Sequence, residues 1–163
     1  MDFLTAIENT SLATWIRESP SLLAYPLVLF LHAAGLALLA GFNTALALRI
    51  LGVGSDIPIA PMERFFPVMV IGFWINAISG AGLLIADATM MLTSLLFFTK
   101  LALIFLAVIN LVVLRKQVLL DPYVDKRPLP TKAKIMAVTS LALWGGAITA
   151  GRLTAYLGSK SLS

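Results

Sequence analysis

Hydrophobic residues dominate four long segments of this chain, and shorter polar segments separate them. The apolar segments run from about 22–48, 65–86, 95–114 and 135–157. Each reaches the roughly 20 residues that a helix needs to cross the hydrocarbon core of a bilayer. None alternates polar and apolar residues as barrel strands do, and lipid offers the backbone no hydrogen-bonding solvent. The pattern therefore predicts an all-α fold, an integral membrane four-helix bundle.

A short helix is predicted ahead of the first span. Thr10 or Ser11 can cap it, and Leu12, Trp15 and Ile16 then share one side. A helix of this kind lies in the membrane interface, with its tryptophan at the depth of the headgroups. The alternative is a short ordered segment that leads directly into the first span.

Composition indicates that one membrane domain accounts for residues 1–163, with residues 1–20 as the interfacial segment. Of the 163 residues, 60% are hydrophobic and 12% charged, whereas an ordinary soluble domain carries about 25% charged residues. No length remains for a separate soluble catalytic domain. The first basic residue is Arg17, so the N-terminus lacks the positive region of a cleavable signal, and the first span is expected to remain as an anchor.

The distribution of basic residues predicts the orientation in the membrane. The longer connections, 49–64 and 115–134, lie on the same side, and a tight turn at 87–94 lies on the other. The longer connections hold Arg49, Arg64, Arg115, Lys116, Lys126, Arg127, Lys132 and Lys134. The opposite side holds Arg17, Lys100, Arg152 and Lys160. This excess places the longer connections in the cytoplasm and both termini outside it.

Small residues recur in two of the spans. Gly35 and Gly41 lie in the first, and Gly145, Gly146 and Gly151 lie in the fourth. Small residues allow membrane helices to approach closely. The first and fourth spans are therefore predicted to form the tightest helix contact.

The residue inventory excludes several classes of chemistry. Cysteine is absent and histidine occurs once, which rules out disulfides, thiolate sites and most zinc sites. No glycine-rich phosphate loop is present, and no basic face with exposed aromatic residues indicates nucleic-acid binding. No catalytic residue is assigned, and whether the protein is an enzyme stays open.

His32 is the first candidate for a binding site. It lies about ten residues into the first span, which corresponds to a depth of about 15 Å, close to the membrane midplane. Gly35 follows on the same face and would leave space beside the imidazole for a flat group such as a porphyrin. The alternative is a neutral histidine that forms hydrogen bonds with Ser, Thr or Asn of a neighbouring helix.

Lys100 and Arg152 are the second candidates. Each lies about five residues inside its span, a depth of about 8 Å, in the same half of the membrane as His32 and Asp87. Each could extend its charge to the interface, which is the simpler explanation for either alone. Together with His32, the two cations could bind an anionic group of an apolar ligand, such as a haem propionate or a lipid headgroup.

The other intramembrane residues that stand out favour structural roles. Asn76 is predicted to form an interhelical hydrogen bond, and Trp144 is predicted to pack in the core. No methionine lies at the depth of His32, so a His–Met haem site within one chain is not expected.

Several segments resemble a bacterial family of uncharacterised small inner-membrane proteins. They are IRESPSLLAYPLVLFLHAAGLALLAG followed by ALRILG, then FFTKLALIFLAVINLVVLR and WGGAITAGRLTAY, within residues 15–157. That family is distantly similar to the membrane domain of copper-resistance protein D and to the four-helix protoporphyrinogen oxidase of the haem pathway. The resemblance implies a bacterial inner membrane and a redox, haem or copper setting. His32 and Lys100 correspond to a histidine and a lysine that the wider group shares, and Arg152 matches the Gly-Arg pattern of the closer family. Leu29 and Ala47 stand where the relatives carry acidic residues.

Three functional hypotheses follow. The first is a haem b-binding or redox-associated membrane protein, with His32 as the metal ligand and Gly35, Lys100 and Arg152 around the cofactor. The second is a non-catalytic accessory subunit of a larger membrane complex. Copper handling is the third. The expected partners are the lipid bilayer, and either a larger membrane complex or a second copy of the chain.

Overall fold

The computed structural model describes residues 2–160, and every regular element in this range is helical. The elements are α1 (Asp2–Glu8), α2 (Ser11–Glu18), α3 (Tyr25–Ile50), η1 (Ala60–Phe65), α4 (Phe66–Ala86), α5 (Ala88–Leu92), α6 (Leu95–Leu114), η2 (Arg115–Leu119) and α7 (Thr131–Lys160). Four of them are long and apolar enough to cross a membrane. The prediction of an all-α, four-helix membrane bundle is confirmed. Residues 1 and 161–163 of the predicted domain lie outside the described range.

The helix ends follow local sequence signals. Helix α3 has proline in its first turn, where the missing N–H removes no helical hydrogen bond. It ends at Ile50, and Gly52 then adopts a φ of 106°, a backbone conformation that only glycine adopts readily. Helix α6 (Leu95–Leu114) has the predicted bounds, whereas α7 (Thr131–Lys160) is longer than predicted. Helix α6 continues into a single turn of π-helix, and α7 begins at Thr131, after two prolines.

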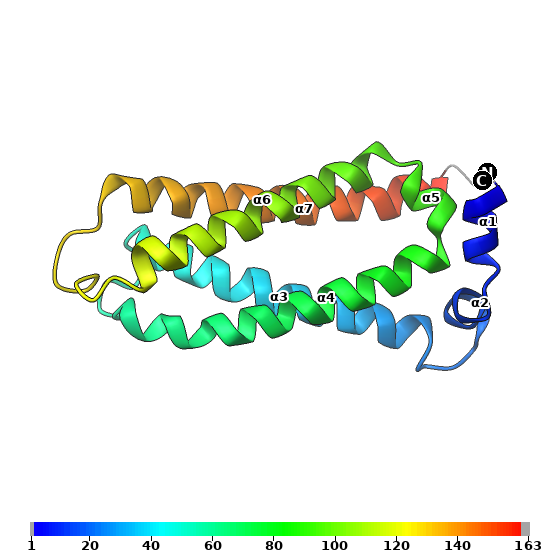
Figure 1. Ribbon diagram of the computed structural model, residues 1–163, viewed down its shortest axis with the longest axis horizontal. Helices are drawn as coiled ribbons and strands as arrows, with labels where there is room; N and C mark the ends of the chain where they lie inside the picture. Colours follow the sequence, from blue (N-terminus) through cyan, green and yellow to red (C-terminus); the bar gives the residue numbers. More distant parts are fainter. Residues whose placement is uncertain (1, 161–163) are drawn as a thin grey trace.

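The four long helices form two antiparallel hairpins, α3–α4 and α6–α7 (Figure 1). Within each hairpin the two helices contact each other extensively, and α3 with α7 makes the main contact between the hairpins. The predicted tightest contact, between the first and fourth spans, is therefore wrong. The closest approach is between α3 and α4.

Two facing glycines explain the close approach of α3 and α4. A Cβ atom added to Gly35 would lie 2.7 Å from the carbonyl oxygen of Gly72, and one added to Gly72 would lie 2.8 Å from that of Gly35. The two backbones therefore meet directly. In contrast, a Cβ atom at Gly41 or Gly145 would meet nothing within 4 Å. Counting small residues did not reveal which of them face another helix.

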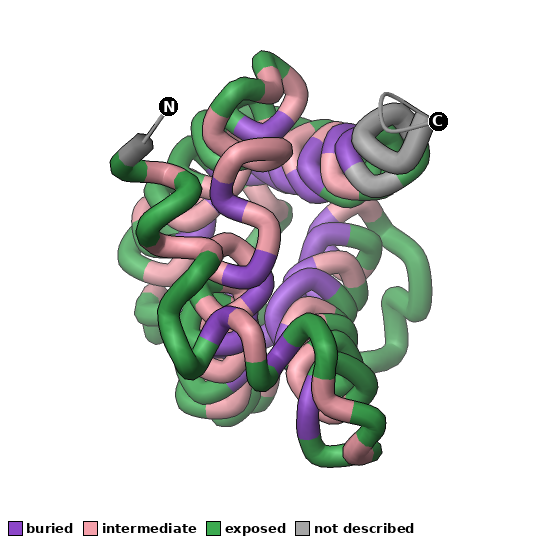
Figure 2. Tube along the Cα trace, turned by 90° about the vertical axis from the view of Figure 1, so that its right-hand side faces the viewer, coloured by how far each residue is buried: buried purple, intermediate pink, exposed green. Residues whose placement is uncertain are grey.

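The buried core is concentrated between the middle of the bundle and the end that carries the longer connections. Trp144 of α7, at 2% exposure, is the largest side chain of the central cluster. It packs there with Leu39, Ala40, Met69, Ala107 and Leu111. Viewed from the opposite end, buried positions lie where helices meet, and exposed positions lie on the outside (Figure 2). The predicted packing role of Trp144 is confirmed.

Polar contacts join the longer connections to each other. Asp125 accepts hydrogen bonds from the backbone N–H groups of Ile59 (2.7 Å) and Ala60 (2.9 Å), at the start of η1. Arg115 pairs with Glu63 at 2.5 Å, and its guanidinium lies 4.0 Å from the ring centroid of Phe66. These contacts tie the two hairpins together at this end.

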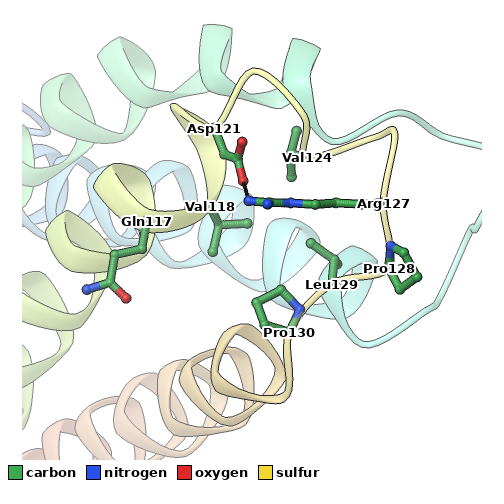
Figure 3. A pocket seen from close by; sticks show the side chains of 8 residues that line it. All are labelled: Gln117, Val118, Asp121, Val124, Arg127, Pro128, Leu129 and Pro130. Carbon is green, nitrogen blue, oxygen red and sulfur yellow. Dashed lines mark hydrogen bonds and ion pairs between the residues drawn. The ribbon is translucent and has the colours of Figure 1, made fainter.

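A small pocket of about 40 Å³ lies in the connection between α6 and α7 (Figure 3). Arg127 extends across it to form an ion pair with Asp121. The N–H of Tyr123 also donates to Asp121, and this bond together with Arg127 lowers the pKa of that carboxyl group. The pocket is a feature of the loop and lies far from the candidate site.

Helices α1 and α2 cover the opposite end of the bundle (Figure 1). Thr10 caps α2 by accepting from the N–H of Ala13 at 3.4 Å, as the sequence predicts. Ile16 is buried at 3% exposure, whereas Trp15 is 46% exposed. Ile16 and Trp15 therefore do not share one side of α2 as predicted. Ile16 faces the bundle, and Trp15 faces outward.

Candidate functional site

His32 lies on the side of α3 that faces α4. Its Nδ1 atom lies 3.0 Å from the backbone carbonyl oxygen of Asn76 and 3.4 Å from the hydroxyl of Ser79. The side-chain amide of Asn76 donates to the carbonyl of His32 at 2.7 Å. The interhelical hydrogen bond predicted for Asn76 is confirmed, and it is made to the backbone of His32.

Gly80 of α4 has no side chain and so leaves room for the imidazole of His32. A Cβ atom at Gly80 would lie 3.0 Å from Cε1 and 3.2 Å from Nδ1 of His32. Each distance is shorter than nine in ten real contacts of a Cβ atom. The ring therefore lies directly on the backbone of α4. Nothing in the sequence singles out Gly80, because its role depends on which helix faces His32.

Gly35 supports this arrangement by a different route from the one expected. The space next to its Cα is filled by the backbone of α4, where a Cβ atom would lie 2.6 Å from the N atom of Asn76. Gly35 thus lets α4 come close enough for Asn76 to reach His32. The flat space expected beside it is occupied by the neighbouring helix.

Lys100 extends from α6 toward α7. A Cβ atom at Gly151 would lie 3.4 Å from Cδ and Cε of Lys100 and 3.6 Å from its Nζ. The lysine is half-buried and lies near enough to His32 for its charge to act on the imidazole. The structure therefore brings these two predicted residues, from different hairpins, into the same region.

Among the described residues, neither Arg152 nor Asp87 forms a hydrogen bond or ion pair with His32 or Lys100. Arg152 is exposed on α7, and its side chain forms no hydrogen bond or ion pair with another described residue. Asp87 lies just beyond α4, near Arg17 and Glu8. Burial raises the pKa of Asp87, the charge of Arg17 opposes this shift, and Glu8 adds to it. Asp87 therefore belongs to the contacts of the N-terminal helices.

Those contacts hold the N-terminal helices against the turn that follows α4. Glu8 accepts a hydrogen bond from the N–H of Thr89 at 2.7 Å. Arg17 donates to the carbonyl oxygen of Ala86 at 3.2 Å. Each bond satisfies a backbone group at a helix end.

Asn43 and Ser140 form a second polar pair, which was not predicted from the sequence. Ser140 of α7 donates to the side-chain oxygen of Asn43 of α3 at 2.5 Å, and both residues are buried. An asparagine within an apolar span was the available signal, since such groups usually find an interhelical partner. This pair lies in the contact between the two hairpins.

Metal chemistry in the chain would depend on His32. Within residues 2–160, no three His, Cys, Asp or Glu side chains gather in a way that could hold a metal ion. A ligand set built by one chain would therefore need groups other than these, or an iron held by a porphyrin.

Comparisons with known proteins identify no relative. No family model, no curated protein and no solved structure matches this chain.

Proposed function

We propose that this four-span membrane protein binds haem b, with His32 as the axial ligand. The observation that carries the proposal is that His32 and Lys100, which belong to different hairpins, lie in the same half of the bundle, close enough for the charge of Lys100 to reach the imidazole. A histidine and a cation, both half-buried in an apolar bundle, suit a ligand that is apolar over most of its surface and carries an anionic group. Haem b fits this description, since it joins a metal-binding macrocycle to two propionates.

The surroundings of His32 fit a metal ligand. Its Nδ1 atom is engaged by α4, and among the described residues none forms a hydrogen bond with Nε2. Histidines that bind metals typically use one ring nitrogen for the metal and the other for a carbonyl or carboxylate. Lys100 would pair with a propionate, and the exposed Arg152 would pair with the second. Gly35 would contribute by bringing Asn76 to His32.

Bound haem would supply one-electron redox chemistry, and the residues of this chain would orient and shield it. The test is an absorbance spectrum of the purified protein supplied with haem. A Soret band that shifts on reduction is expected, and His32→Ala should lose it while the helical content stays unchanged. Lys100→Met is expected to weaken haem binding. The positions of the absorbance bands should stay unchanged, because His32 still binds the iron. A protein that stays colourless refutes the proposal.

A non-catalytic subunit of a larger membrane complex is the second candidate. The share of each span that is buried favours it, at 17, 22 and 17% for the first three spans against 39% for the fourth. The outer faces of α4 and α6 are therefore open to lipid or to another protein. Stoichiometric co-purification of a partner from native membranes would support this role. A stable, monodisperse protein alone in mild detergent would contradict it.

We also propose that the longer connections face the cytoplasm, on the basis of their excess of basic residues. Single cysteines in place of Ser55 and Thr131 should be labelled from the cytoplasmic side alone. A cysteine in place of Thr93, in the turn at the other end, should be labelled from outside. The reverse result would place the His32 half of the bundle on the cytoplasmic side.

A further inference from the structure

We propose that residues Asn76, Ser79 and Gly80 of α4 hold His32 in one neutral tautomer, with the proton on Nδ1 and a lone pair on Nε2. The ligand at Nε2 is then an electron-pair acceptor, either a metal centre or an N–H or O–H donor. A carboxylate, phosphate or carbonyl oxygen is excluded from that position. The inference rests on the proposed function only where it names haem iron as the acceptor.

The carbonyl group of Asn76 determines the position of the proton. A carbonyl oxygen only accepts hydrogen bonds, and this one lies 3.0 Å from Nδ1, which is within the normal range for N–H···O. An unprotonated Nδ1 would set its lone pair against the lone pairs of that oxygen. In an apolar span such repulsion is weakly screened. Nδ1 therefore carries the proton.

The hydroxyl of Ser79 agrees with this assignment. It donates to the carbonyl oxygen of Ile75 at 2.6 Å, so its single hydrogen is already used. Toward Nδ1, at 3.4 Å, it can only accept. The hydroxyl would stabilise an N–H group at Nδ1 and would not stabilise a lone pair.

The amide of Asn76 is the one group that could favour the opposite tautomer. Its Nδ2 atom lies 3.3 Å from Nδ1 but 2.7 Å from the carbonyl oxygen of His32. The amide has two hydrogens, and the carbonyl oxygen of His32 accepts one of them. The other could reach Nδ1 only across 3.3 Å, whereas the carbonyl oxygen of Asn76 lies closer to Nδ1, at 3.0 Å, and is the stronger partner. The side-chain amide of Asn76 therefore joins α4 to α3, and the backbone carbonyl of Asn76 determines the tautomer of His32.

Gly80 makes this geometry accessible and holds it. The imidazole lies on its Cα, with Cε1 and Nδ1 where a Cβ atom would come within 3.0 and 3.2 Å. A side chain at this position would push the ring away from the carbonyl of Asn76. Rotating the ring by half a turn would place a C–H group at that carbonyl and remove the hydrogen bond. Gly80 is thus a positioning residue for His32.

The experiment uses the single histidine of the chain. Protein labelled with ¹⁵N-histidine contains one imidazole, so its two nitrogen resonances need no assignment among residues. At a pH where the ring is neutral, we expect Nδ1 to show the shift of a protonated nitrogen and Nε2 the shift of an unprotonated one. The opposite pattern, or averaged shifts of two exchanging tautomers, overturns the proposal.

Two glycine variants test the role of α4. Gly80→Ala should convert the single tautomer into a mixture, because the methyl group displaces the ring. Gly82→Ala is the matched control, since its Cβ atom would lie 3.4 Å from Val28 and 3.7 Å from Ile16, which are ordinary contacts. A Gly80→Ala protein that keeps the wild-type shifts contradicts the role of Gly80. If that variant fails to fold, the wild-type spectrum still decides the tautomer.

Adding haem separates this inference from the proposed function. If haem binds at Nε2, the resonance of Nε2 should move or broaden, and the proton should remain on Nδ1. A wild-type protein that has the proton on Nδ1 and leaves added haem unbound refutes the haem proposal and supports the tautomer. A protein that binds haem through Nδ1 overturns the tautomer inference.

Discussion

The two halves of the bundle differ in how completely their helices are packed. Helix α3 crosses both halves, and its buried residues are Gly35, Leu39, Ala40, Asn43, Leu46, Ala47 and Ile50. Its first ten residues, 25–34, include none. The half with the longer connections therefore holds the core, and the half with the N-terminal helices holds His32 and Lys100. Within α3, the residues that pack in the core and the candidate ligand His32 therefore lie in different parts of the helix.

This separation has a physical reason. A densely packed interior has few voids and accepts no additional group without strain. A binding site needs side chains that are held from one side and accessible from the other. His32 meets this condition, because α4 holds Nδ1 and leaves Nε2 free of described partners. Trp144 does not, because it is enclosed by aliphatic side chains and alanines.

The largest expected effect is on Trp144. Trp144→Ala should reduce the free energy of unfolding by about 3–5 kcal/mol, because it leaves a cavity in the central cluster. Unfolding by denaturant in detergent micelles measures the loss. Trp74→Ala is the control, since Trp74 is 59% exposed and its removal should have a much smaller effect. Equal losses for both variants would show that the packed core is not centred on Trp144.

The second effect is on His32. His32→Ala should cost only about 1 kcal/mol, the typical net value of one hydrogen bond, because the side chain of His32 is only half-buried. The same denaturation measurement checks it. Haem binding should be lost at the same time. A loss as large as that of Trp144→Ala would show that His32 is part of the structural core, and the contrast between the halves would fail.

The third effect concerns the polar contact between the hairpins. A double-mutant cycle of Asn43→Leu and Ser140→Ala should give a coupling energy of about 0.6 kcal/mol, the average for hydrogen bonds between membrane helices. Unfolding free energies of the two single variants and the double variant provide it. Additive effects would mean that the 2.5 Å contact contributes no coupling between the hairpins.

The smallest effect is a pH dependence from Asp87. Burial raises its pKa above the ordinary value of 3.8, so its contribution to stability is greatest below that value and decreases as the pH rises through the raised pKa. Asp87→Asn should therefore be more stable than wild type at neutral pH and lack this part of the pH dependence. Melting temperatures across an acidic-to-neutral series test this. Parallel curves for the two proteins would contradict it.

The sequence by itself determined the four spans, and it placed the cap of α2 at Thr10 or Ser11. These follow from hydropathy, chain length and the rise of a helix, which are local properties. It also indicated that Asn76 must find a partner on another helix, since lipid cannot satisfy its amide. His32 and Lys100 were identified for the same reason, because polar groups are costly within lipid.

The tertiary structure alone decided which faces meet. The four spans are apolar on nearly all sides, so no hydrophobic stripe indicates the inner face of a helix, as it would in a soluble bundle. Only the packing of α3 on α4 identified Gly72 and Gly80, which matter through the backbone that approaches them. The packing of α6 on α7 left Arg152 exposed and placed Lys100 against Gly151, in the half of the bundle that holds His32, because the rotation of a helix about its own axis sets where its side chains point.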